Sequence, residues 1–262
     1  MSNRVKRLAT VVLLFSSFFV VDTRCGCERA SAGNEQIIVT IDGPTGAGKS
    51  TTARTLADRL GWFYFASGMV WRALTHILVH EFGYTKEQLR HPRESDVRAI
   101  FDSGDLVYRY DGYVQLVWRG EDITPLLKSS FIDQHVWILW QDADTRARLR
   151  DIQRRLIERE RHIVAESRDT ASVVFPEAQF KFFMTASLNV RAERWRELQH
   201  KRGEVFTHNG ACTFIDDRDD KEMPYASSPY DNGIEVIDTT SLNAEEVVAL
   251  MFEKIRCTYV VQ

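Results

Sequence analysis

The segment from Gly43 to Ser50 reads GPTGAGKS, which fits the spacing GxxxxGK[ST]. An apolar run, Ile37–Ile41, precedes it and has the composition of a buried strand. The segment that follows, 49–60, carries apolar residues on one helical face and ends at Gly61, a residue type common at helix C-termini. A strand, a glycine-rich loop and a helix in this order predict an α/β fold.

The residue types of this loop suit the binding of a polyphosphate. Glycines let the backbone wrap closely, so that its N–H groups and the start of the helix face negative charge. Lys49 is expected to bridge the terminal phosphates, and the Ser50 hydroxyl to hold Mg²⁺. A glycine-rich turn that binds nothing is the alternative, but the flanking strand and helix match the context that the motif requires. The residues expected to contact ATP along this segment are Gly43, Pro44, Thr45, Gly46, Ala47, Gly48, Lys49, Ser50 and Thr51.

Length and composition set broader limits. A chain of 262 residues of which 44% are hydrophobic can bury one large core or two smaller ones. A formal net charge of −3 offers no overall positive field, so nucleic acid is not an expected partner. Four cysteines, at 25, 27, 212 and 257, lack the paired spacing of a zinc site and form no disulfide framework.

Residues 1–35 are expected to lie outside the fold. Basic residues precede an apolar run, Leu8–Val21, whose length suits a secretory signal better than a membrane span. The triplet Ala30-Ser31-Ala32 resembles a cleavage site, although charged residues separate it from the apolar run. The alternatives are a membrane tether, an organelle presequence, or upstream nucleotide sequence that is included in the reading frame but not translated in the cell. Contact with a membrane is therefore expected only if this segment is retained.

Two strand-like runs, 106–110 and 113–118, flank Asp111-Gly112 and predict a β-hairpin. An antiparallel hairpin inside a chain that otherwise alternates strand and helix suggests an insertion, which we place at 85–140. The end of this insertion, 126–140, reads as one buried apolar helix.

Charged residues gather after the strand expected at 162–166. Glu166 ends this strand, and Arg168 and Asp169 follow it. Ligands of open α/β sheets bind beyond the carboxyl ends of the strands, so these side chains are candidates for a site. Further along, the stretch 203–232 is punctuated by Gly, Asp and Pro, and we expect an irregular loop that acts as a lid.

Six stretches, taken together and in order, resemble the bacterial cytidylate kinase family. They read IDGPTGAGKSTTARTLADRLG, ASGMVWRALT, WRGEDIT, AESRDTASVVFPEA, IDDRDD and IEVIDTTSLNAEEVV, and they extend from residue 37 to about residue 256. The glycine-rich loop alone is shared by many families. The second stretch, and the Arg-Asp pair with its following Val-Phe-Pro in the fourth, are much more specific to this one.

The resemblance implies a P-loop NTPase fold with a five-stranded parallel core sheet. It also implies a nucleotide-acceptor domain with a small antiparallel sheet, inserted at 85–140, and a mobile lid at 203–232, all within a kinase domain spanning 36–262. The implied reaction moves the γ-phosphoryl of ATP to CMP or dCMP, giving ADP and the diphosphate, with Mg²⁺ as the metal. Because ATP and CMP pools are intracellular, the resemblance implies a cytoplasmic enzyme, which we expect to be a monomer.

The resemblance assigns several residues to the acceptor nucleotide. Ser67 and Arg72 match its binding positions in the second stretch, and Arg146 matches an arginine of the helix after the insertion. Arg72 by itself also reads as a solvated surface charge. The residues implied to bind the acceptor are Ser67, Arg72, Arg146, Arg168, Asp169 and Asp219. Asp169 has an alternative interpretation as a helix cap or as a partner of Arg168.

Other residues are implied to act on the donor side. Arg194, at the base of the lid, is assigned to ATP, and Ser50 and Glu166 are assigned to Mg²⁺. The residues implied to act in phosphoryl transfer are Lys49, Arg168 and Arg218.

The chain departs from the family pattern at three places. Glu166 stands where the family has aspartate, and Trp137 replaces a small hydroxyl residue that contacts cytosine. Acidic residues follow Arg218 where the family has further arginines, and Asp220 and Glu222 are close enough in sequence to oppose it. We therefore expect slow turnover and a narrower preference for CMP over UMP.

Two alternatives to a CMP kinase follow from these departures. One is a kinase for another nucleoside monophosphate such as UMP. The other is a weakly active module that binds ATP, which the acidic lid and the N-terminal segment favour. The acceptor arginines argue against this second alternative, because a protein that only binds ATP has no use for them.

Overall fold

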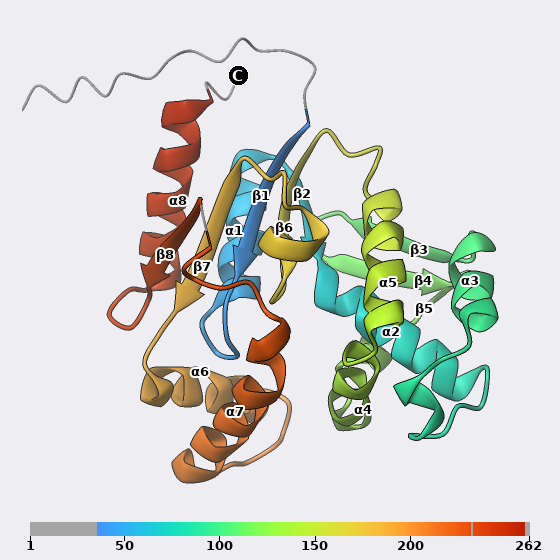
Figure 1. Cartoon of the computed structure of the whole chain (residues 1–262). Coiled ribbons are helices and arrows are strands. Elements are labelled where there is room, and N and C mark those ends of the chain that lie inside the picture. Colours follow the sequence, from blue (N-terminus) through green and yellow to red (C-terminus); the bar gives the residue numbers. More distant parts are fainter. Residues whose placement is uncertain (1–35, 232, 260–262) are drawn as a thin grey trace, which may run out of the picture.

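The computed structural model describes residues 36–231 and 233–259. Its centre is a parallel sheet of five strands in the order β2-β6-β1-β7-β8 (Figure 1). The strands are β1 (Ile37–Asp42), β2 (Phe63–Ala66), β6 (His162–Glu166), β7 (Phe180–Thr185) and β8 (Ile234–Asp238). β1 is buried along its whole length, as expected for a central parallel strand covered on both faces. The expected parallel core sheet is confirmed.

Helices cover the two faces of this sheet and form two apolar cores. On one face, α1 (Lys49–Leu60) and α8 (Ala244–Thr258) pack together against Val39 and Ile41 of β1. On the other face, α2 (Ser67–His80) and α5 (Ala143–Leu156) share a core with Ile38. Alternate residues of β1 thus serve opposite cores, because side chains of a strand alternate between its faces. A short π-type turn, η3 (Thr170–Val174), follows β6.

A second sheet of three antiparallel strands lies beside α2 (Figure 1). It contains β3 (Leu106–Tyr110), β4 (Val114–Trp118) and β5 (Glu121–Asp122), so the hairpin expected from the sequence is confirmed. The elements around it are η1 (Gln88–Arg90), α3 (Glu94–Asp102), η2 (Thr124–Lys128) and α4 (Ser130–Trp140).

The segment 126–140 is not one helix, as the sequence suggested. It begins within η2 and continues as α4 after a break at Ser129. Ser129 has extended backbone angles, and its side chain accepts a hydrogen bond from the Ile132 amide at 3.4 Å. This is the geometry of a helix N-cap, so the serine starts a new helix rather than continuing the old one.

The stretch 203–232 is also more ordered in its secondary structure than the sequence suggested. It contains a helix of 15 residues, α7 (His208–Glu222), followed by the short η4 (Met223–Tyr225), so the expectation of an irregular stretch is wrong there. Thr207 caps α7, and Ala211 and Ile215 pack on Trp195 of α6 (Leu188–His200). α7 buries few apolar residues, and much of its sequence is acidic. Hydrophobic periodicity therefore did not predict this helix.

The expectations for residues 1–35, including the leader and the first two cysteines, fall outside the described residues. Within the described part of the chain, Cys212 and Cys257 are free thiols. The helices described here include none with the length and apolarity needed to cross a bilayer.

The close approach of β1 to β7 makes Gly43 a position where the fold itself can be tested. Gly43 has φ +143°, and a Cβ placed there would lie 2.0 Å from the Met184 carbonyl oxygen. We expect Gly43→Ala to lower the free energy of unfolding by at least about 3 kcal/mol in urea denaturation. Gly61 is the matched control, because it also has positive φ but no heavy atom within 4 Å of an added Cβ. Gly61→Ala should cost about 1 kcal/mol, and equal effects of the two variants would contradict the proposed backbone clash.

Candidate active site

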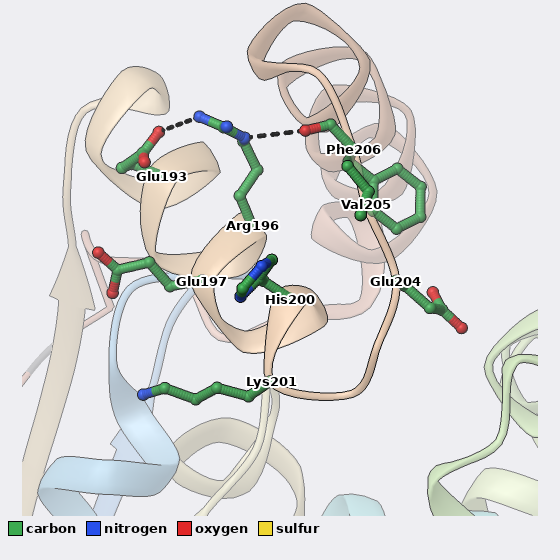
Figure 2. Close-up of a pocket in the computed structure, with 8 residues that line it drawn as sticks. All are labelled: Glu193, Arg196, Glu197, His200, Lys201, Glu204, Val205 and Phe206. Carbon is green, nitrogen blue, oxygen red and sulfur yellow. Dashed lines mark hydrogen bonds and ion pairs between the residues drawn. The ribbon is translucent and has the colours of Figure 1, made fainter.

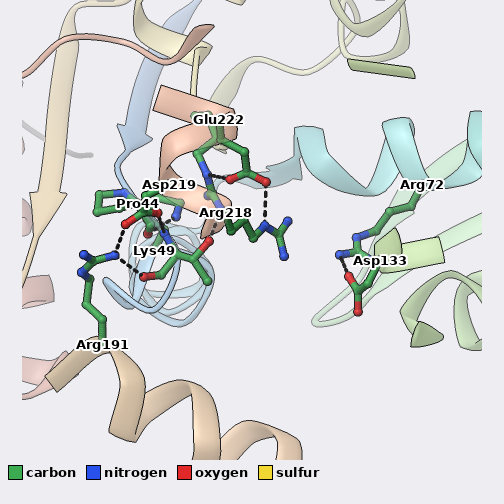
Figure 3. A network of polar contacts seen from close by, with 10 residues as sticks. Pro44, Lys49, Arg72, Asp133, Arg191, Arg218, Asp219 and Glu222 are labelled. Carbon is green, nitrogen blue, oxygen red and sulfur yellow. Dashed lines mark hydrogen bonds and ion pairs between the residues drawn. The ribbon is translucent and has the colours of Figure 1, made fainter. Parts of the chain in front are cut away.

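The phosphate loop, residues 43–48, joins β1 to α1 at the carboxyl edge of the parallel sheet. Lys49 opens α1, and its buried Nζ donates a hydrogen bond to the Pro44 carbonyl at 2.8 Å (Figure 3). Burial lowers the pKa of Lys49 to about 7, and the positive charge of Arg168 adds to this effect. The amine therefore lies over its own loop, where it can contact a phosphate. Thr51, also assigned to ATP, lies in the first turn of α1.

Ser50 and Glu166 lie side by side, as their assignment to one metal ion requires. The Ser50 hydroxyl donates to Glu166 Oε1 at 2.9 Å. The strand register explains this proximity, since Ile41 of β1 pairs with Glu166 of β6 at the point where the phosphate loop begins. Among the described residues, no group of three or more His, Cys, Asp or Glu side chains could hold a metal ion by protein ligands alone. A hydroxyl and a carboxylate nevertheless suit Mg²⁺ that arrives with a nucleotide, because phosphates and water complete its coordination.

A buried carboxylate joins two arginines assigned to catalysis. Glu222, the last residue of α7, accepts a hydrogen bond from Arg168 Nε at 2.6 Å and another from Arg218 Nε at 2.6 Å. Burial alone would raise the pKa of Glu222, but the two guanidinium groups outweigh it and hold this pKa at about 2. Arg168 also donates to Thr45 Oγ1 at 2.8 Å. Arg168 thus contacts the phosphate loop, and Glu222 orients both arginines. Figure 3 shows Arg218 and Glu222 near Lys49.

Asp219 lies at the phosphate loop, near Arg168. One of its oxygens accepts from the Thr45 amide at 3.4 Å, and the other is paired with Arg191 of α6. Arg191 also donates to the Thr45 carbonyl at 3.1 Å. Asp219 therefore attaches α7 to the phosphate loop, and its implied contact with the acceptor nucleotide stays a prediction. Glu222, one helical turn later, reaches the arginines instead.

Arg72 and Arg146 stand on either side of α4. Arg72 donates to the Leu127 carbonyl at 2.9 Å and forms an ion pair with Asp133, at a distance from the cluster around Lys49 (Figure 3). Arg146 donates to the Trp140 carbonyl at 3.3 Å. The structure therefore separates Arg72 from the residues at the phosphate loop. Arg146 is closer to them, because its charge and that of Arg168 both act on Asp169.

Two further residues assigned to the acceptor nucleotide are buried. Each has one side-chain oxygen without a hydrogen-bond partner among the described residues. Ser67 begins α2, and its Oγ has no partner among the described residues. Asp169 Oδ1 is in the same condition. Burial raises the pKa of Asp169 to about 7, and the nearby charge of Asp42 acts in the same direction. An unpaired buried polar atom is costly, so both groups are candidates to contact a ligand.

Arg194 supports the nucleotide site indirectly. Its guanidinium donates to Thr239 Oγ1 at 2.9 Å, to the Thr239 carbonyl at 2.8 Å and to the Leu242 carbonyl at 3.1 Å. Thr239 Oγ1 in turn lies 3.2 Å from the Ala47 carbonyl in the phosphate loop. Arg194 therefore holds the loop after β8 against the phosphate loop.

Aromatic contacts connect α4 and α5 to the segment 203–232. Lys221 Nζ lies 5.5 Å from the centre of the Trp137 ring. Tyr225 lies edge-on to Trp140 at 5.9 Å between ring centres, and the Arg146 guanidinium lies 4.4 Å from the centre of the Tyr225 ring. The end of α7 and η4 thus touch the elements that carry the acceptor arginines.

A surface hollow beside α6 contains none of the residues predicted for the site (Figure 2). Arg196 spans it, with an ion pair to Glu193 at 2.6 Å and a hydrogen bond to the Phe206 carbonyl at 3.0 Å. Its residues serve the packing of α6 against the following loop, and we assign no ligand to it.

Comparison with known proteins agrees with this geometry. The family model described as cytidylate kinase matches residues 39–257. The chain belongs to the cytidylate kinase family. It is similar to the cytidylate kinase of Caldanaerobacter subterraneus subsp. tengcongensis, with 36% identity over 85% of this chain and 96% of the relative. It is also similar to the cytidylate kinases of Methylococcus capsulatus, with 35% identity over 80% and 93%, and Carboxydothermus hydrogenoformans, with 33% identity over 82% and 95%.

Within this cytidylate kinase fold, the predicted residues form two groups. Those gathered at the phosphate loop are Lys49, Ser50, Glu166, Arg168, Arg218 and Asp219, and those around α2, α4 and α5 are Ser67, Arg72 and Arg146. Sequence reasoning missed Tyr225 and Arg191, and it treated Glu222 only as an opposing charge. The spacing of Arg218 and Glu222, four residues apart, is typical of a helical ion pair and was the available signal.

The lowered pKa of Lys49 predicts proton uptake when ATP binds. At pH 8 most Lys49 side chains are neutral in the free protein, and a bound polyphosphate raises their pKa again. Calorimetric titration with ATP at pH 8, in buffers with different ionisation enthalpies, should therefore show uptake approaching about one proton per ATP. Lys49→Met should abolish this uptake, whereas Lys201→Met, a change at an exposed lysine, should preserve it. Binding of ATP without proton uptake would contradict the lowered pKa.

Proposed function

We propose that this protein transfers the γ-phosphoryl group of ATP to CMP or dCMP, forming CDP or dCDP and ADP. The main support is the presence of two groups of cations, one at the phosphate loop and one beside α4, within a member of the cytidylate kinase family. A kinase needs both, because each of its two substrates carries phosphate. The intracellular supply of both nucleotides supports a cytoplasmic site of action.

On the donor side, the phosphate-loop amides and Lys49 would hold the β- and γ-phosphates of ATP. Ser50 and Glu166 would hold Mg²⁺, which neutralises charge on the phosphates when it is bound. Arg168 and Arg218 already lie at this loop with their orientation fixed by Glu222. Charge developing on the transferred group would draw these guanidinium groups from the carboxylate to the phosphoryl oxygens.

On the acceptor side, Arg72 and Arg146 would bind the phosphate or the nucleoside of CMP, and Arg168 would link the two sides. Arg72 would have to exchange its partner Asp133 for the acceptor, as paired arginines do when a phosphate offers better bidentate contacts. Movement of α4 toward the phosphate loop would shorten the separation between the groups. We therefore infer that acceptor binding is coupled to closure of the inserted region.

A broader acceptor range is supported by one observation. Trp137 occupies the position where the family has a small hydroxyl residue, and its ring faces Lys221. An indole ring lacks the hydroxyl group that would read cytosine, so UMP is the second candidate acceptor.

The acceptor is tested with purified protein beginning at residue 34 and a panel of CMP, dCMP, UMP, AMP and GMP. Release of ADP should have the largest kcat/KM with CMP or dCMP, and UMP should follow within a factor of about 10⁴ because Trp137 removes one hydrogen-bonding partner. Lys49→Met is the control for contaminating kinases and should abolish the signal. A higher kcat/KM for UMP, AMP or GMP would contradict the proposed acceptor.

Arg218 tests the proposed role of α7 in transfer. We expect Arg218→Ala to lower kcat for CMP at least about hundredfold with little change in KM for either nucleotide, because its contact would strengthen in the transition state. Wild-type turnover itself should lie toward the low end of roughly 1–100 s⁻¹. Arg196→Ala, on α6 and outside the site, is the matched control and should be nearly normal. A kcat for Arg218→Ala within about threefold of wild type would remove Arg218 from the transition state.

A further inference from the structure

Tyr64 contacts the same oxygen of Glu166 that accepts from Ser50. The Tyr64 hydroxyl donates to Glu166 Oε1 at 3.3 Å, and the Ser50 hydroxyl donates to it at 2.9 Å. Tyr64 is 4% exposed, and Glu166 is 8% exposed. No hydrogen bond to the other oxygen, Oε2, is found among the described residues, so that oxygen keeps its capacity to accept.

The sheet register produces this contact. β2 pairs with β6 in parallel, with Tyr64 opposite Val164 and Ala66 opposite Glu166. Residues two apart on a strand share a face. Tyr64 pairs with Val164, two residues before Glu166, so both side chains lie on the face that packs on α1. The tyrosine side chain is long enough to span this offset, and it brings its hydroxyl to Glu166. The Tyr110 ring, edge-on at 5.4 Å between ring centres, packs against the Tyr64 ring and limits its movement.

A glutamate at this position has a specific physical problem. Its extra methylene adds a rotatable bond compared with aspartate, so ordering the side chain costs more conformational entropy. A buried hydroxyl that donates to the carboxylate offsets part of that cost. It also selects the rotamer in which Oε1 meets Ser50.

We infer that Tyr64 is a positioning residue for the metal site, which holds Glu166 against Ser50 so that Oε2 is available to Mg²⁺. The inference builds on the proposed function, which brings Mg²⁺ to the site with ATP. Tyr64 touches neither metal nor nucleotide in this role, and it acts through Glu166 alone.

The test measures the affinity of the full chain for Mn²⁺, used as a probe for Mg²⁺, in the presence of saturating ADP. Electron paramagnetic resonance monitors the Mn²⁺ titration. Tyr64→Phe removes only the hydroxyl, and we expect the affinity for Mn²⁺ to fall by about tenfold or more, the effect of one hydrogen bond to a charged group. Affinity for ADP in EDTA should be unchanged. Tyr110→Phe is the matched control, because its hydroxyl bonds Asp58 instead of Glu166, and it should bind Mn²⁺ like wild type.

A double-mutant cycle separates positioning from a general structural effect. Glu166→Asp shortens the side chain and should break the contact, so Tyr64→Phe should have little further effect on Mn²⁺ affinity in that background. Wild-type Mn²⁺ affinity in Tyr64→Phe would overturn the inference. An equal loss of ADP affinity in EDTA, or a loss that is additive with Glu166→Asp, would overturn it as well. The titration contains no acceptor, so these outcomes are independent of whether CMP is phosphorylated.

Discussion

Parallel pairing of β1 with β6 brings the phosphate loop and Glu166 to one edge of the sheet. Ile41 and Glu166 are partners in this register, and the chain after each leads directly into the site, to the phosphate loop on one side and to Arg168 on the other. A shift by one residue would turn Glu166 to the opposite face, because side chains alternate along a strand. The contact of Ser50 with Glu166, the position of Arg168 and the contact of Tyr64 with Glu166 all depend on this alignment.

Charge balance organises the rest of the site. Three of the arginines assigned to the reaction are paired with carboxylates. Arg168 and Arg218 pair with Glu222, and Arg72 pairs with Asp133. Buried cations without partners would be costly, so these pairs maintain the arginines in place before substrates bind. Arginine binds phosphate and carboxylate in the same bidentate geometry, so a substrate phosphate can take the place of either carboxylate, and this exchange would drive the proposed closure.

Side-chain contacts connect α7 and η4 to the inserted region, so a movement of one in the proposed closure would affect the other. Trp137 faces Lys221, and Tyr225 lies between Trp140 and Arg146. A departure from the family at position 137 is therefore also a contact with the segment that carries Arg218. This surface therefore connects α7 and η4 to α4 and α5.

The sequence by itself determined the strand, loop and helix around Lys49, the hairpin and the family, because these depend on local spacing and periodicity. It assigned Ser50 and Glu166 to one metal ion, and the structure brings the two side chains into contact, since strand ends converge at one edge of a parallel sheet. Only the tertiary structure decided which carboxylate meets which arginine. Asp219 and Glu222 are both acids of one helix, but Asp219 reaches Arg191 and Glu222 reaches Arg168. That choice depends on how α7 packs on its neighbours, and the contact of Tyr64 with Glu166 depends on the register of β2 against β6. Neither leaves a signal in residue spacing.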